Sequence, residues 1–357
     1  MTRVFYCLLF CHILFCSAQD PADAWIKTSV KQQFAPFQHL KLTQQDLLKI
    51  LDTHKELFLC VIKHKQIQFF GRYDSILGDE EIKKRLQSVL GALKYLNSTM
   101  DLTNVCFLIS VEDSCSKDLP VLTFAKDKTT QSICIPDFEA LKGYMHIDEQ
   151  IAQGRKQYPF EKKFEQAFWR GATTGGHFSL SNWKKFPRTQ LVCLGLNHPQ
   201  ELDAKFSLLI QADPKDAFEL KQKMAREKMF GKVTSIQDHL QYKYLIDVDG
   251  NSCTYSRLYW ILRSNSLCIK QLSNHVQWYY SLLTPYKHYL PFSADFSDLI
   301  EQIQWAKNHP EEVQLMIQNA NALSEEYLTH AQALLYLFYV IQEYKTLIDY
   351  KSFLKRF

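Results

Sequence analysis

The stretch of residues 244–271 constrains the fold of this chain more than any other. It reads YLIDVDGNSCTYSRLYWILRSNSLCIKQ, in which an apolar run ends in Asp247-Val248-Asp249-Gly250 and a short polar turn follows. A helix is expected from about Tyr255 to Arg263, and a second apolar run begins near Leu267. This strand–turn–helix–strand order is typical of α/β folds.

The same alternation continues along the chain. Near-continuous apolar runs predict strands that are covered on both faces, and one-sided apolar stripes predict helices. A chain of 357 residues is too long for one compact core, and the polar stretch at residues 154–163 separates two halves. Strands are expected at Leu57–Ile62, Val105–Val111, Val121–Phe124, Lys243–Val248 and Leu267–Lys270, and helices at Asp79–Leu96, Glu311–Tyr327 and Ala331–Tyr344.

The first residues are typical of an export signal. Arg3 precedes an apolar stretch from Val4 to Phe15, and small residues follow at Ser17 and Ala18. The apolar run is shorter than the roughly 20 residues that span a bilayer. We therefore expect a signal peptide at residues 1–18 and a mature protein in a secretory lumen, in a periplasm or outside the cell. An uncleaved anchor is the alternative.

Charge and cysteine content narrow the class of protein further. The net charge of +4 is too small to indicate a nucleic-acid partner. Of the 10 cysteines, Cys7, Cys11 and Cys16 fall in the signal, and the remaining seven cannot all pair within one chain. No C-x-x-C pattern indicates zinc, and one or two disulfides stay open in an exported protein.

The turn after the apolar run at residues 243–248 has features of a phosphate site. Ligands of open α/β sheets bind beyond the carboxyl ends of the strands, where a helix N-terminus carries a partial positive charge. Thr254 and Ser256 add hydroxyl groups there, and Arg257 adds a guanidinium that suits a pyrophosphate. An ordinary connection with capping residues is the alternative interpretation.

Two further segments end expected strands with polar groups. The run PFEKKFEQAFWRGATTGG ends in Trp169-Arg170-Gly171 and continues through Thr173 to two glycines, so its backbone amides can approach a phosphate closely. It is not a Walker loop. The strand that begins at Val105 runs into Glu112-Asp113, where a carboxylate is placed to act as a general base.

Together these segments resemble glycosyltransferase family 90. The matching words are PFEKKFEQAFWRGATTG, YLIDVDGNSCTYSRLYWILRSNSLCIKQ and WYYSLLTPYKHYLPF, in the family's order, and the resemblance runs from about Val105 to Leu328. The resemblance implies a GT-B architecture, in which two Rossmann-like domains face each other across a cleft. The expected parts are an acceptor-side domain at residues 19–160, a nucleotide-sugar domain at residues 161–310 and C-terminal helices at residues 311–357 that return to the first domain.

The resemblance also implies a reaction and its residues. The family is inverting, uses a nucleotide sugar as co-substrate and generally needs no metal or other cofactor. Asp113 matches the position of the catalytic base, with Glu112 and Asp118 as reserves, while Arg170 and Arg257 would neutralise the leaving diphosphate. The residues expected to bind the donor are Trp169, Arg170, Gly171, Thr173, Asp249, Gly250, Thr254, Ser256 and Arg257.

The expected function is the transfer of a sugar, glucose or xylose, from a UDP-sugar to a hydroxyl of a glycan, a lipopolysaccharide or a protein serine. Two alternatives remain at this point. One is a catalytically silent protein of the same fold that binds a glycan or a nucleotide. The other is a metal-dependent enzyme, because Asp247 and Asp249 form a D-x-D pattern of hard oxygen ligands.

Overall fold

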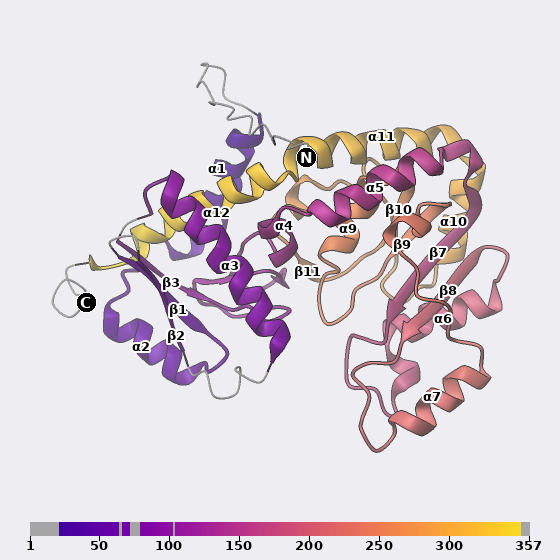
Figure 1. Ribbon diagram of the computed structural model, residues 1–357, viewed down its shortest axis with the longest axis horizontal. Coiled ribbons are helices and arrows are strands. Elements are labelled where there is room, and N and C mark those ends of the chain that lie inside the picture. The colour runs from indigo at the N-terminus through magenta and orange to yellow at the C-terminus, as the bar shows by residue number, and fades with distance from the viewer. Residues whose placement is uncertain (1–20, 64–65, 72–78, 103, 351–357) are drawn as a thin grey trace, which may run out of the picture.

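The computed structural model describes residues 21–63, 66–71, 79–102 and 104–350. The expected signal peptide at residues 1–18 lies outside them. Within these ranges the chain is an α/β protein with two five-stranded sheets, one built by each half (Figure 1). No helix in the described ranges is both long enough and apolar enough to cross a membrane.

The first half builds a mixed sheet in the order β2-β1-β3-β4-β6. β1 runs antiparallel to both β2 and β3, whereas β3, β4 and β6 are parallel. Its strands are β1 (Phe58–Lys63), β2 (Gln66–Phe70), β3 (Val105–Ile109), β4 (Val121–Thr123) and β6 (Ile133–Cys134), with β5 (Lys126–Asp127) outside the sheet. Its helices are α1 (Pro21–Phe34), α2 (Gln44–Thr53), α3 (Glu80–Thr99), α4 (Phe138–Lys142) and α5 (Met145–Gln157).

The second half builds an entirely parallel sheet in the order β12-β10-β9-β7-β8. Its strands are β7 (Phe164–Ala172), β8 (Leu202–Leu208), β9 (Tyr242–Asp247), β10 (Leu267–Gln271) and β12 (Leu290–Phe292), and the short β11 (His275–Val276) lies apart. Its helices are α6 (Pro187–Asn197), α7 (Ala217–Arg226), α8 (Ile236–His239), α9 (Ser256–Leu262), α10 (Leu299–Asn308), α11 (Pro310–Tyr327) and α12 (His330–Tyr344).

The apolar runs of the sequence form strands because both faces of the second sheet are buried. On β9, Tyr244 and Ile246 face one hydrophobic core, while Leu245 faces a second core. The second core is shared with the first half of the chain and includes Trp260 of α9 and Phe107 of β3. The expected strands and helices are confirmed to within a few residues, and α3 begins where Asp79 caps its first amides.

The last helix, α12, lies on the first half of the chain. It packs along α1 and contacts α4 and β3 (Figure 1), whereas α11 packs on α9 and β10 of the second half. Tyr344 near the end of α12 is fully buried. Its hydroxyl donates to the Pro120 carbonyl at 2.7 Å and accepts from the Leu108 amide at 3.2 Å. This hydroxyl therefore ties the C-terminal helix to the first sheet.

The substitution Tyr344→Phe is expected to lower the free energy of unfolding by about 1–3 kcal/mol, because two buried backbone groups lose their side-chain partner. Chemical denaturation of the purified chain measures the loss. Tyr339→Phe on the same helix is the control, since Tyr339 is half-buried, and its effect should stay within about 0.5 kcal/mol. Equal effects of the two substitutions would contradict this account of α12.

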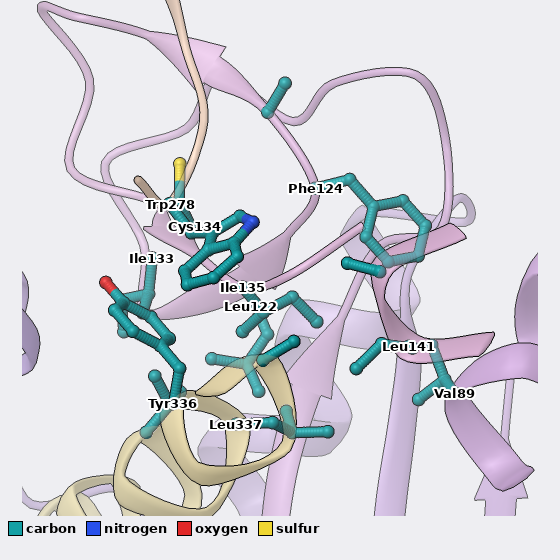
Figure 2. Packing of buried hydrophobic residues seen from close by; sticks show 14 of the residues in the cluster. Val89, Leu122, Phe124, Ile133, Cys134, Ile135, Leu141, Trp278, Tyr336 and Leu337 are labelled. Carbon is teal, nitrogen blue, oxygen red and sulfur yellow. The ribbon is translucent and has the colours of Figure 1, made fainter. Parts of the chain in front are cut away.

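An aromatic cluster joins the two halves on the side of α12. Trp278, from the segment after β11, lies beside Cys134 of β6 and Tyr336 of α12 (Figure 2). The ring centroids of Trp278 and Tyr336 are 5.0 Å apart, and Trp25 of α1 lies 6.0 Å from Trp278. Segments far apart in the sequence thus share one packed seam. The seven cysteines in the described ranges are all free thiols, and six of them are buried.

Candidate functional site

The candidate site lies at the carboxyl edge of the second sheet. β7, β9 and β10 are neighbouring parallel strands, so the turns that follow them meet at one edge. In open α/β sheets this edge is where ligands bind. The turns concerned are those after Ala172, after Asp247 and after Gln271. The donor-binding residues expected from the sequence lie in the first two turns, at the end of β7 and at the start of α9.

Two arginines, the buried Arg188 and the half-buried Arg257, converge on this edge. Arg188, in the first turn of α6, donates to the carbonyls of Asp249 and Ala172, each at 3.0 Å. Arg257, in the first turn of α9, donates to the carbonyl of Arg170 at 2.6 Å. Both guanidiniums lie over the ring of the fully buried Trp169, at 5.6 and 5.9 Å from its centroid. Trp169 therefore supports the two cations.

Neither arginine forms an ion pair among the residues that the structure describes, although the charges of Asp247 and Asp249 act on them. Their hydrogen bonds go to backbone carbonyls, and Nη1 of Arg257 is buried without any partner. Burial and the neighbouring Arg257 lower the pKa of Arg188 to about 9, and burial lowers the pKa of Arg257. A helix N-terminus also disfavours a cation in its first turn. Two neighbouring cations that form no ion pair indicate a site for an anion.

Sequence reasoning missed Arg188. It lies beyond the run PFEKKFEQAFWRGATTGG, in the first turn of the helix that follows, and reaches Asp249 over a separation of 61 residues. One signal was available in the sequence, because Arg188 directly follows Pro187. Proline is common at the first position of a helix. The residue that follows such a proline lies in the first helical turn, where a positive charge is unfavourable.

Glycines allow the turns after β7 and β9 to approach the arginine pair. A Cβ atom on Gly250 would lie 2.5 Å from Oγ1 of Thr174 and 2.9 Å from Nη2 of Arg188. Gly175 has a φ of +100°, which favours glycine, and its amide donates to Oδ1 of Asn251 at 3.0 Å. The two turns are thus in direct contact around Arg188.

The substitution Gly250→Ala is expected to weaken the binding of an anionic ligand about tenfold, because the new methyl group must displace the Arg188 guanidinium. Calorimetry with UDP measures the change. Gly91→Ala is the matched control, since a Cβ there meets nothing within 4 Å and alanine favours the α3 helix by up to about 1 kcal/mol. Unchanged affinity in Gly250→Ala would show that the ligand does not use this turn.

Three of the four carboxylate oxygens of Asp247 and Asp249, the D-x-D pattern, accept hydrogen bonds from other side chains of this chain. Asp247 is fully buried and accepts from Nζ of Lys270 at 3.0 Å and from Oγ1 of Thr254 at 2.5 Å. Burial acts to lower the pKa of Lys270, but the negative charges of Asp247 and Asp249 outweigh it and raise that pKa. Asp249 accepts from Nδ1 of His275 at 3.0 Å and from the Ser273 hydroxyl.

The remaining expected donor residues have mixed surroundings. Arg170 forms an ion pair with Asp203 of β8 at 2.7 Å. The Thr173 hydroxyl is buried and exchanges hydrogen bonds with the backbone of Ile210 at 2.6 and 2.7 Å. Gly171 packs on the Trp169 ring, where a Cβ would approach to 2.5 Å. Ser256 is half-buried at the start of α9, next to Arg257.

The first half of the chain contributes Asp113 to the same region. Oδ1 of Asp113 accepts from Arg85 of α3 at 2.7 Å, and Oδ2 accepts from the Asn251 amide at 2.7 Å. Its carbonyl accepts from the hydroxyls of Ser252, at 2.8 Å, and Tyr255. Because Asn251 also holds Gly175, one side chain connects the carboxylate of Asp113 with the turn beside the arginine pair.

The backbone of Tyr255 is strained at this contact. Its φ of 48° lies in a region that side chains rarely adopt. Strain of this kind persists where the surroundings hold it, and it is frequent at functional sites. Here the Tyr255 hydroxyl reaches the loop of Asp113 and its ring lies 5.4 Å from that of Phe138.

The two reserve acids lie in different surroundings. Burial raises the pKa of Glu112, whose neighbouring charges include Arg85, Asp79 and Glu56 of the first half. Asp118 accepts from the Gln131 amide at 3.2 Å within the first half. Of the three acids, Asp113 is therefore the one whose carboxylate hydrogen-bonds to the turn after β9 within the part of the chain that the structure describes.

Comparisons with known proteins agree with the resemblance seen in the sequence. The model of Glycosyl transferase family 90 matches residues 25–356. The chain is 29% identical over 237 residues to protein O-glucosyltransferase 2 of Danio rerio, which covers 64% of this chain and 43% of that protein. It is 24% identical over 352 residues to protein O-glucosyltransferase 3 of Homo sapiens, covering 92% and 65%.

A bacterial relative and a solved structure were also found. The O-glucosyltransferase LpsA of Dichelobacter nodosus is 27% identical over 192 residues, covering 54% of this chain and 52% of that protein. The chain thus spans less than two thirds of the length of each of these three relatives. The structure of Anabaena HepE in complex with UDP aligns with a TM-score of 0.38 at 11% identity, covering 72% of this chain and 77% of that one.

Proposed function

Because the chain belongs to glycosyl transferase family 90, we propose that it is an inverting glycosyltransferase that uses a UDP-sugar. The transferred sugar is glucose or xylose, and the acceptor is a hydroxyl of a glycan, a lipopolysaccharide or a protein serine. The names of the relatives, which are O-glucosyltransferases, support the choice of glucose. The export signal expected from the sequence at residues 1–18 supports a secretory lumen, a periplasm or the outside of the cell as the proposed place of action.

The observation that carries the proposal is the pair of guanidiniums at the carboxyl edge of the second sheet, which form no ion pair among the described residues. A diphosphate supplies the missing negative charge, and it accepts hydrogen bonds from guanidinium groups in a bidentate manner. Nη1 of Arg257 has a free donor for this purpose. We therefore place the UDP diphosphate against Arg188 and Arg257, with Gly250 allowing its close approach.

The proposed architecture is GT-B. The first sheet belongs to an acceptor-side domain at residues 19–160, and the second sheet to a donor domain at residues 161–310. The contacts of α12 with α1, α4 and β3 support a returning C-terminal segment within residues 311–357. In this arrangement Asp113 faces the donor turn from the opposite domain, as its hydrogen bonds to Asn251 and Ser252 suggest.

In the proposed reaction Asp113 takes the proton of the acceptor hydroxyl. The acceptor oxygen forms a bond to the anomeric carbon of the sugar while the bond from that carbon to the diphosphate oxygen breaks on the opposite face. Negative charge then grows on the diphosphate, where Arg188 and Arg257 stabilise it. Arg85 and Asn251 each occupy one oxygen of Asp113, and a carboxylate retains further lone pairs for the acceptor.

We propose that this reaction needs no divalent metal. Two guanidiniums already supply positive charge at the diphosphate site. The Asp247 carboxylate, which a metal would require in the D-x-D interpretation, is neutralised by Lys270. Its second partner, Thr254, occupies the other oxygen.

The function is tested by incubating the purified chain with UDP-glucose, UDP-xylose, UDP-galactose and UDP-N-acetylglucosamine. We expect UDP-glucose or UDP-xylose to be bound and slowly hydrolysed at the same rate with and without a chelator. Binding without turnover, also in the presence of acceptors, would support the silent binding protein. Loss of turnover on chelation would overturn the metal-free mechanism, and failure to bind any of the four donors would overturn the donor site.

A further inference from the structure

The carboxylate of Asp249 has one oxygen that no group in the described residues satisfies. The residue is 9% exposed. Oδ2 accepts from the Ser273 hydroxyl and from Nδ1 of His275 at 3.0 Å. Oδ1 is buried and has no hydrogen-bond partner. A buried acceptor of this kind costs free energy unless a ligand or water donates to it.

The position of Asp249 restricts the kind of group that can donate. Its own carbonyl accepts from Arg188 at 3.0 Å, so the residue adjoins the proposed diphosphate site. Burial acts to raise the pKa of Asp249, but the His275 hydrogen bond and the charge of Lys270 outweigh it and lower that pKa. An ionised carboxylate repels a phosphate. It accepts from a neutral hydroxyl, and a UDP-sugar carries hydroxyls on its ribose and on the transferred sugar. The transferred sugar fits better here, because Asn251 in the same turn hydrogen-bonds Asp113, the proposed base, which must lie near that sugar.

We infer that Oδ1 of Asp249 accepts a hydrogen bond from a hydroxyl of the transferred sugar, and that His275 is a positioning residue that holds the carboxylate for this contact. The inference rests on the proposed function, because it needs the UDP-sugar at the arginine pair. It divides the donor site into a cationic part for the diphosphate and an anionic part for the sugar.

His275, which orients the Asp249 carboxylate, is itself held in place by the first half of the chain. His275 lies in β11, which pairs antiparallel with β5, and its cross-strand partner is Asp127. Asp127 and Lys270 are the other charged groups that act on His275. The strand that carries the positioning residue is therefore held by both halves, so the carboxylate is oriented before the sugar arrives.

Calorimetry that compares UDP with UDP-glucose tests the inference. The wild-type chain should bind UDP-glucose more tightly than UDP. Asp249→Ala should remove this advantage, with a loss of roughly 10- to 100-fold for UDP-glucose, while its affinity for UDP stays equal or rises because a negative charge beside the diphosphate is gone. A loss of fold would instead weaken both ligands together.

Two variants test His275 in the same assay. His275→Phe should lower the ratio of the two affinities as Asp249→Ala does, whereas His275→Gln retains an N–H donor and should restore most of the ratio. A merely structural role would not separate UDP from UDP-glucose, nor would glutamine rescue it. An unchanged ratio in His275→Phe would overturn the positioning role.

Deoxygenated donors provide a test on the ligand side of the contact. Each monodeoxy analogue of UDP-glucose is titrated into the wild-type chain and into Asp249→Ala. At least one analogue should bind the wild-type chain roughly tenfold or more weakly than UDP-glucose does. The same analogue and UDP-glucose should bind Asp249→Ala with equal affinity. If UDP binds and every analogue binds the wild type as UDP-glucose does, the sugar contact is overturned while the proposed function stands. If neither UDP nor UDP-glucose binds, both are overturned.

Discussion

Arg257→Met is expected to abolish UDP-sugar binding and, in the absence of ligand, to stabilise the chain. The guanidinium lies buried between the rings of Trp169 and Trp260, makes one hydrogen bond to a carbonyl and leaves Nη1 without a partner. Replacing such a charge with an apolar side chain of similar length removes a desolvation penalty, which we expect to raise the free energy of unfolding by about 1 kcal/mol or more. Removing it from the diphosphate should weaken UDP binding by about 100-fold or more.

The expected loss of UDP binding and the expected gain in stability have opposite signs, so a general loss of structure cannot produce both. Thermal unfolding without and with UDP measures stability and binding in one experiment, since a ligand that binds the folded chain raises its melting temperature. Arg155→Met is the matched control, because Arg155 pairs with Glu325 at an exposed position. It should change neither quantity beyond about 0.5 kcal/mol.

Arg188→Met is expected to weaken UDP binding to a similar degree, with a different effect on stability. Arg188 donates to the carbonyls of Ala172, Val248 and Asp249, so its loss leaves several buried acceptors unpaired. We expect this variant to be no more stable than the wild type. Undiminished UDP affinity in both variants would refute the assignment of the arginine pair to the diphosphate.

Asp113→Asn is expected to lower the rate of sugar transfer by about 10²- to 10⁴-fold, the usual contribution of a general base. Asparagine has nearly the same shape and keeps an oxygen that can accept from Asn251 or Arg85, but it cannot take a proton from the acceptor. The affinity for UDP-glucose should stay within about twofold of the wild type, because the arginine pair and the turn after β9 are unchanged. Single-turnover transfer and calorimetry measure the two quantities.

The neighbouring acids serve as controls for the base. Glu112→Gln and Asp118→Asn should each keep at least roughly a third of the transfer rate, since surface or loop substitutions away from the reacting atoms have small effects. Glu112 lies among charges of the first half, and Asp118 caps the Gln131 amide. Full transfer by Asp113→Asn, or a large loss in Glu112→Gln, would move the role of base to another acid.

Much of the fold was predictable because it depends on local patterns. The strand β9, the helix α9 and the strand β10 occupy the residues where apolar runs and a helical stretch were expected, within one or two positions. Because both faces of a parallel sheet are buried, its strands consist of near-continuous apolar runs that can be recognised in the sequence. The family resemblance likewise depends on contiguous sequence segments, and the family match over residues 25–356 confirms it.

The partners of charged side chains were not predictable, because they lie far apart in the sequence. Asp247 meets Lys270 over 23 residues, and the D-x-D pattern by itself gives no sign of this ion pair. Arg170, expected at the diphosphate, instead meets Asp203 on the adjacent strand. A pattern along one strand cannot tell which side chain of a neighbouring strand will lie opposite.

The sequence by itself determined the kind of protein, namely an α/β chain of a glycosyltransferase family with a polar edge at the end of its second set of strands. Only the tertiary structure decided how the charges at that edge are distributed. It paired Asp247 with Lys270 and, among the described residues, left Arg188 and Arg257 without an ion pair. The physical reason is that strands and helices form from neighbours in the chain, whereas the electrostatic balance of a buried site is set by groups that the fold brings together.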